Sequence, residues 1–374
     1  MSETTESAPS PEEIAAARPS QSFRAQVWRG LRKDPAGVIG LSGIVLLLIV
    51  ALLAPLLAND RPIVCKYDGD LKFPALATYV DTWVPWRDLQ FSIKSIKIGD
   101  AVPFSDYDPD LGDRTWKSVA DSPEMEWALW PPIPWSPRQF DKENIKQPPS
   151  EAHTLGTDDQ GRDVLARLIH GSVVAVLVGV VSMGIACFIG ITLGLLAGYY
   201  GGKVDLVLSR ITEIVICFPV LFLIITVIAF LPPSVLNIMV VIGLRRWTGI
   251  FRLIRGEVFV VRQQEYVTAA EALGVPPPRI LFRHILPNAV APVFVTVAFG
   301  IAGAVLVETS LSFLGFGDPY APSWGEVVMQ GRRYVTQGLW HLTVFPGLCI
   351  FATLTAFNLF GQSLRDAMDP KLRR

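Results

Sequence analysis

Three charged side chains stand inside or beside apolar stretches, where a charge needs a structural or functional reason. Arg245 and Arg246 end the apolar run 234–244, and Glu308 lies within the apolar segment 289–315. In a membrane helix the two arginines would lie roughly 16 Å deep, where a charge facing lipid is costly. Either they line a water-filled pathway and meet substrate carboxylates, or the helix leaves the membrane early. Glu308 could couple a proton, although a hydrogen bond between helices is the simpler interpretation.

An acidic cluster precedes another apolar segment and could suggest a metal ion. Thr157-Asp158-Asp159 and Asp163 lie close together, with Arg162 and Arg167 interleaved. Aspartate and threonine are typical residues at the start of a helix, where free N–H groups need acceptors. We therefore predict that Thr157-Asp158-Asp159 caps a helix and that the carboxylates pair with the arginines, rather than binding a metal.

The remaining candidates for chemistry fail on spacing. The stretch 198–205, GYYGGKVD, is no phosphate loop, because it lacks a required glycine and has Val204 where a hydroxyl must bind magnesium. The four cysteines form no CxxC motif, and three of them fall in apolar segments. No nucleophile is paired with a base and no basic patch fits a nucleic acid. We expect no catalytic residue, no metal site, no cofactor and no nucleic-acid partner.

Composition indicates that these residues are carried by several membrane spans. Of 374 residues, 51% are hydrophobic and 18% are charged, and the mean hydropathy is +0.39. The net charge of −1 conceals a separation, since residues 59–170 contain 19 acidic and 13 basic side chains and the remainder contains 15 and 20. Lysine and arginine concentrate on the cytoplasmic side of membrane proteins, so residues 59–170 are expected outside the cytoplasm.

The hydrophobic pattern divides the chain into a tail, a first span, an insertion and a core. Residues 1–35 form a cytoplasmic tail with a basic amphipathic helix over Phe23–Lys33, and residues 36–58 form the first span. Residues 151–374 form the core. The five further spans are predicted at 171–200 (rich in glycine for close packing), 211–231 (with a kink at Pro219), from 234 onward, 289–315 and 338–361. Six crossings place both termini in the cytoplasm.

The insertion, residues 59–150, is polar but holds six of the ten tryptophans, so we expect it to fold. Alternating residues at 91–98, FSIKSIKI, predict a strand. The aromatic side chains could form a groove that contacts peptides, but a role in the core and at the lipid interface is the simpler interpretation.

The polar stretch 264–288 is predicted to form two short helices that meet at a sharp bend. Gly274 ends the first helix, because glycine adopts left-handed backbone angles without a Cβ clash. Pro276, Pro277 and Pro278 prevent its continuation and suit the start of a second helix. Such a knob between membrane spans can dock into another protein, and the alternative is an amphipathic loop on the membrane surface.

These residues also carry a family resemblance. Thr268-Ala269-Ala270, Gly274 and Leu286-Pro287 resemble the coupling-loop signature of permease subunits of ATP-binding-cassette importers, with Thr268 in place of a glutamate. Residues 265–288 are similar to the dipeptide, oligopeptide and nickel permease family, and the insertion resembles that of the Yej subgroup. The coupling loop, 262–288, would then contact the ATPase through Glu265, Tyr266, Ala269, Ala270, Glu271, Gly274, Arg279, Leu286 and Pro287.

The resemblance implies an all-α polytopic protein of the cell inner membrane, with the six helices of the type I importer permease fold and a mixed extracytoplasmic insertion. It implies a non-catalytic subunit that forms half of a pore for peptides in the lipid bilayer. Its partners would be a homologous second permease subunit, two ATP-binding subunits and an extracytoplasmic solute-binding protein. Arg245, Arg246 and Glu308 are candidates to line the pathway. Alternatives are a permease for nickel or another chelate and a self-contained secondary transporter, although the latter usually needs more spans.

Overall fold

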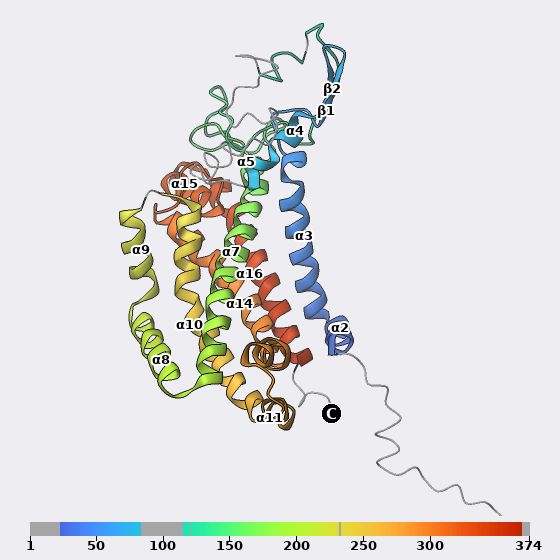
Figure 1. Cartoon of the computed structure of the whole chain (residues 1–374). Coiled ribbons are helices and arrows are strands. Elements are labelled where there is room, and N and C mark those ends of the chain that lie inside the picture. Colours follow the sequence, from blue (N-terminus) through green and yellow to red (C-terminus); the bar gives the residue numbers. More distant parts are fainter. Residues whose placement is uncertain (1–22, 84–114, 121, 232, 369–374) are drawn as a thin grey trace, which may run out of the picture.

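The computed structural model describes residues 23–83, 115–120, 122–231 and 233–368 and is mostly helical (Figure 1). A small sheet lies at one end of a bundle of long helices, which we call the insertion end, and α11 lies at the opposite end, which we call the knob end. The long helices are α3 (Pro35–Leu57), α7 (Val164–Tyr200), α10 (Val235–Arg262), α14 (Ala291–Phe313) and α16 (His341–Met368). The bundle also contains α2 (Phe23–Lys33), α8 (Gly202–Cys217), α9 (Val220–Phe230), α15 (Trp324–Tyr334) and the 3₁₀ turn η2 (Val335–Gln337).

Within the described residues, α3, α7, α14 and α16 are long and apolar enough to cross a membrane. The pair α8 and α9 adds a fifth candidate if the two helices are one span bent by 85°. The bend lies at Phe218 and Pro219, as the predicted kink requires, but the helical segment begins at Gly202 rather than at residue 211. Helix α10 is about 42 Å long by helical rise, and its charged side chains from Arg245 onward keep it out of this apolar class.

The first two helices follow the predicted boundaries closely. Helix α2 covers the predicted Phe23–Lys33, and α3 begins one residue before the predicted span. The Asp34 carboxylate accepts a hydrogen bond from the Ala36 N–H at 3.1 Å and thereby caps α3. Helix α3 packs closely on α16, because Gly37 and Gly40 have no side chain. A Cβ built on Gly37 would collide with Ser363, and one built on Gly40 would collide with Phe360.

The described part of the insertion contains an antiparallel sheet in the order β2-β1-β3, formed by β1 (Val64–Tyr67), β2 (Asp70–Lys72) and β3 (Met125–Leu129). Two short helices, α4 (Pro74–Ala77) and α5 (Tyr79–Trp83), follow β2. Cys65, Tyr67, Trp116, Val119 and Met125 form its small apolar core. The predicted strand at 91–98 lies outside the described residues.

The start of the insertion, at Asn59, pairs with a later part of it, at Ile133, beside the end of α3. The N–H of Ile133 donates to the Leu57 carbonyl, and the N–H of Asn59 donates to the Ile133 carbonyl, both at 3.1 Å. The resulting parallel bridge joins Ala58 to Ile133. The imidazole Nε2 of His170, which is on α7, lies 2.8 Å from the Ala58 carbonyl oxygen. Residues 60–132 therefore leave and rejoin the helical body at one place.

The predicted cap of α7 is wrong. The helix begins at Val164, and the Asp163 carboxylate accepts a hydrogen bond from the Ala166 N–H at 2.7 Å. The side chains of Thr157 and Asp158 are engaged elsewhere, because Thr157 accepts from the Gln147 N–H and Asp158 binds arginines. Asp163 is the residue that remains to satisfy the free N–H groups of the first turn.

Glycines bring α7 and α10 into close contact, as the composition of α7 predicts. Cβ atoms built on the evenly spaced Gly190, Gly194 and Gly198 would lie 2.7–2.9 Å from side-chain carbons of α10, where Ile250, Ile254 and Val258 pack into the groove. Small residues allow this approach in lipid, where van der Waals packing drives association between helices. Gly184 differs, because nothing lies within 4 Å of the Cβ built there.

Candidate functional site

The stretch after α10 forms the predicted knob, which we define as residues Glu265–Ala289. Helix α11 (Glu265–Ala272) ends in a Schellman motif: the Gly274 N–H donates to the Glu271 carbonyl at 3.0 Å and the Val275 N–H donates to the Ala270 carbonyl at 3.1 Å. Gly274 has φ of +75°, which confirms the predicted left-handed conformation. Nothing lies within 4 Å of a Cβ built on Gly274, so the backbone angle alone requires glycine there.

The second half of the knob returns toward the bundle as a continuous but irregular helix. It consists of α12 (Pro277–Arg279), the π-helix η1 (Ile280–Ile285) and α13 (Leu286–Ala289). The prolines at 276–278 start it as predicted. The π turn was not predicted, and it directly precedes Pro287, which has no N–H to donate to an α-helical ladder.

One face of the knob joins the main apolar core. Val267, Ala270, Ile280, Leu281 and Ile285 are buried and belong to the same cluster as the inner side chains of α7 and α10. This face therefore fixes the knob to the ends of these two helices.

The opposite face of the knob is open, and most of the predicted contact residues lie there. The exposed ones are Glu265, Tyr266, Ala269, Glu271, Gly274, Arg279 and Pro287, whereas Ala270 is buried and Leu286 is half-buried. The open face also presents Leu273, 83% exposed, and Phe282, 64% exposed. Helical spacing in the sequence singles out Leu273 but not Phe282. Exposed apolar side chains of this kind are typical of a surface that contacts another protein.

Two arginines of α10 connect this helix to α7 and to α8. The Arg262 guanidinium donates to the Tyr199 carbonyl at 2.5 Å, where α7 ends, and lies over the Tyr199 ring. The Arg255 guanidinium binds the Asp205 carboxylate through two nitrogens, with Nη2 to Oδ2 at 2.7 Å. Bidentate pairs of this kind fix geometry as well as charge. The second pair connects α8 to α10.

Arg245 and Arg246 lie on α10 itself, which continues unbroken through them from Val235 to Arg262. Both are partly exposed, and within the described residues neither forms an ion pair. Arg245 donates to the Thr248 hydroxyl at 3.2 Å. Arg246 extends across the backbone of α14 at Gly303.

Glu308 is a buried residue of α14. Its side chain is 3% exposed, and it accepts a hydrogen bond from the Ser312 hydroxyl at 2.7 Å.

The acidic cluster at the insertion end forms a buried charge network. The Asp158 carboxylate accepts from Arg162 Nε at 2.7 Å and from Arg167 Nη1 at 2.6 Å. Burial opposes the charge of Asp158, but Arg167 and Arg162 outweigh it and hold the pKa of the carboxyl below its usual value. Arg167 also donates to Gln330 of α15 at 2.6 Å, a partner that the sequence did not indicate. The predicted pairing with both arginines is confirmed for Asp158, whereas the Asp163 carboxylate lies 2.9 Å from Nδ1 of His153.

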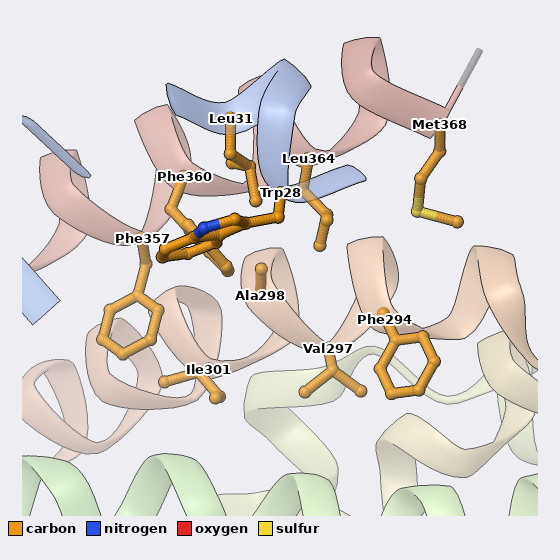
Figure 2. A pocket seen from close by; sticks show the side chains of 10 residues that line it. All are labelled: Trp28, Leu31, Phe294, Val297, Ala298, Ile301, Phe357, Phe360, Leu364 and Met368. Carbon is orange, nitrogen blue, oxygen red and sulfur yellow. The ribbon is translucent and has the colours of Figure 1, made fainter. Parts of the chain in front are cut away.

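A groove of about 480 Å³ opens between α2, α14 and α16 (Figure 2). Its lining is apolar and includes Trp28, Phe294 and Phe357. The Arg32 guanidinium lies over the Trp28 ring, 4.8 Å from its centre. Among the residues that the structure describes, no titratable side chain lines the groove.

Two family models match the sequence. Residues 190–374 match the "Binding-protein-dependent transport system inner membrane component" and residues 22–74 match the "N-terminal TM domain of oligopeptide transport permease C". Among solved structures, a chain of the MetNI methionine ABC transporter gives a TM-score of 0.44 at 18% identity, covering 54% of this chain and 97% of its own length.

Curated relatives extend the match across the insertion. The peptidoglycan transport system permease protein YejE of Agrobacterium fabrum is 31% identical, covering 92% of each chain. The inner membrane ABC transporter permease protein YejE of Escherichia coli is 33% identical, covering 92% of this chain and 96% of its own length. The dipeptide transport system permease protein DppC of Alkalihalophilus pseudofirmus is 39% identical, covering 62% and 76%. The chain therefore belongs to the family of inner membrane components of binding-protein-dependent transport systems.

Proposed function

We propose that this chain is a permease subunit of an ATP-driven, binding-protein-dependent importer of peptides. The observation that carries the proposal is the knob, whose buried face is part of the core of α7 and α10 and whose opposite face is open. A rigid connection of this kind lets a force on the knob tilt the long helices. Relatives described as dipeptide, peptidoglycan and oligopeptide permeases favour a peptide as the cargo.

The topology that accompanies this function has six crossings, with α8–α9 as one bent span and α10 as another. Both termini and the knob lie in the cytoplasm and the insertion lies outside. The basic side chains of α2, 29–33, and those of the knob support this orientation through the positive-inside rule.

The partners are a homologous second permease subunit, two ATP-binding subunits and a solute-binding protein. The ATP-binding subunits hydrolyse ATP, and this chain has no catalytic role of its own. ATP binding must favour one conformation of the pore over another, because a ligand shifts an equilibrium only by its difference in affinity for the two states. We propose that the open face of the knob transmits that difference.

Arg245 and Arg246 line the pathway in this proposal, whereas Glu308 serves as a buried hydrogen-bond acceptor. The partial exposure of the two arginines and the burial of Glu308 support this division. A lipid-facing position for both arginines would be costly.

Crosslinking tests the role of the knob. In a background without the four native cysteines, Leu273→Cys is expected to crosslink to an ATP-binding subunit of the assembled complex. Phe230→Cys, at the end of α9, is a matched control, because Phe230 is 85% exposed and Leu273 83%. Crosslinks from position 273 to lipid alone would contradict the proposal.

Labelling tests the orientation independently. In intact cells a membrane-impermeant maleimide should modify Leu71→Cys, which is exposed on β2, and should spare Leu273→Cys until the cells are opened. The reverse order of labelling would place the knob outside and reject the coupling role. Peptide uptake into vesicles without any ATP-binding subunit would instead favour a secondary transporter.

A further inference from the structure

We infer that Arg245 and Arg246 form a binding site for the free carboxylate of a peptide on the open side of α10. The inference rests on the proposed function, and it assigns a chemical class to what the pathway accepts. It is carried by the position of the two guanidinium groups, by the exposed residues on the helix face of Arg245 and by the lack of a carboxylate partner in the described part of the chain.

The two arginines have no carboxylate partner in the described part of the chain. Every ion pair there involves other residues, and the Arg245 Nε is buried without a hydrogen-bond acceptor. Elsewhere on the same helix Arg255 is satisfied by Asp205 through two nitrogens. Because two adjacent guanidinium groups repel one another, an anion placed between them lowers the free energy of the site.

The helix face that carries Arg245 is open over its next two turns. Arg245, Gly249, Arg252 and Gly256 follow at intervals of three and four residues, which is the spacing of one helix face. Gly249, Arg252 and Gly256 are exposed, and nothing lies within 4 Å of a Cβ built on either glycine. A surface facing lipid is apolar, so this cationic, small-residue face fits a water-filled passage instead.

Gly303 of α14 sets the position of Arg246. A Cβ built on Gly303 would lie 3.1 Å from the Arg246 Cζ and would collide with Nη2. The guanidinium therefore rests directly on the α14 backbone, between the two helices. A planar donor held in this way can bind both oxygens of a carboxylate, which an ammonium group cannot do with the same geometry.

The test compares a peptide that has a free C-terminal carboxylate with the same peptide amidated. Uptake is measured in proteoliposomes that contain the full complex with its own solute-binding protein. Arg246→Ala should lower uptake of the free acid about tenfold or more, which is the usual effect of losing a charge-assisted hydrogen bond, and should leave uptake of the amide unchanged. Gly303→Ala should act in the same direction, because the added methyl displaces the guanidinium.

Three further variants are compared on uptake of the free acid alone, so the result does not depend on how well the solute-binding protein delivers the amide. Gly184→Ala adds a methyl on α7 without a contact and should transport the free acid normally. Arg246→Lys should retain part of the uptake, whereas Arg246→Met, which is similar in length but uncharged, should not. Equal uptake by the lysine and methionine variants would overturn the inference, as would an equal loss for acid and amide. Absence of ATP-dependent uptake by the wild type would instead reject the proposed function.

Discussion

The bend of the knob provides a sharp test of the reasoning, because a single backbone angle determines it. Gly274 has φ of +75°, and no atom would touch an added methyl group. Gly274→Ala therefore changes nothing except the energy of the left-handed conformation, which costs a residue with a Cβ about 1–2 kcal/mol. That energy lowers the local opening free energy of the Schellman motif, and it corresponds to a roughly 5- to 30-fold larger open population.

Hydrogen exchange of the purified protein measures this population directly. The amides of Gly274 and Val275 are hydrogen-bonded across the motif, so their protection should fall by the same roughly 5- to 30-fold factor. Gly274→Asn should have a smaller effect, because asparagine adopts left-handed angles more readily. Gly256→Ala is the control, since Gly256 lies inside α10 and a Cβ there also meets nothing.

Coupled transport should follow the same order of variants. If the bend transmits force from an ATP-binding subunit, ATP-driven uptake falls most for alanine, less for asparagine and not at all for Gly184→Ala, whose added methyl on α7 meets nothing. Unchanged protection at 274–275 in the alanine variant would refute the structural argument. Reduced protection with unchanged uptake would refute the coupling role alone.

Three other predictions concern stability and can be measured by denaturation in detergent. Gly194→Ala should be about 1–3 kcal/mol less stable than Gly184→Ala, because both gain the same helix propensity but only Gly194 meets a facing helix. Reversing the Asp205–Arg255 pair in a double variant should recover part of the loss caused by either single charge reversal. The pKa of the Asp158 carboxyl is lowered in the folded protein. Its contribution to the free energy of unfolding should therefore be complete above the unfolded pKa of about 4 and be lost as pH falls through the folded value. Asp158→Asn should lack this acid-dependent loss.

The features that the sequence predicted well are those determined by neighbouring residues. A positive φ at Gly274, a helix start after three prolines and an apolar run as long as α3 each depend on a short stretch of chain. Glycines in α7 predicted close packing, because small residues have few other uses in a membrane helix.

The features that it missed depend on residues far apart. Gln330 approaches Arg167 across 163 positions, and Gly303 lies beneath Arg246 only because α10 crosses α14 there. The cap of α7 was misassigned because other groups occupy the suitable side chains: Thr157 binds Gln147, and Asp158 binds Arg162 and Arg167. Side-chain type indicates what a residue can bind, whereas the fold determines which partner reaches it first.

The bridge between Ala58 and Ile133 has a consequence for how such a chain can change. Neighbouring strands lie less than 5 Å apart, so a short connection across this point could replace residues 60–132 while every long helix kept its place. Segments whose two ends nearly touch are the ones that proteins gain, lose or exchange most readily. The insertion of this chain can therefore vary in size and content from one relative to another, independently of the long helices.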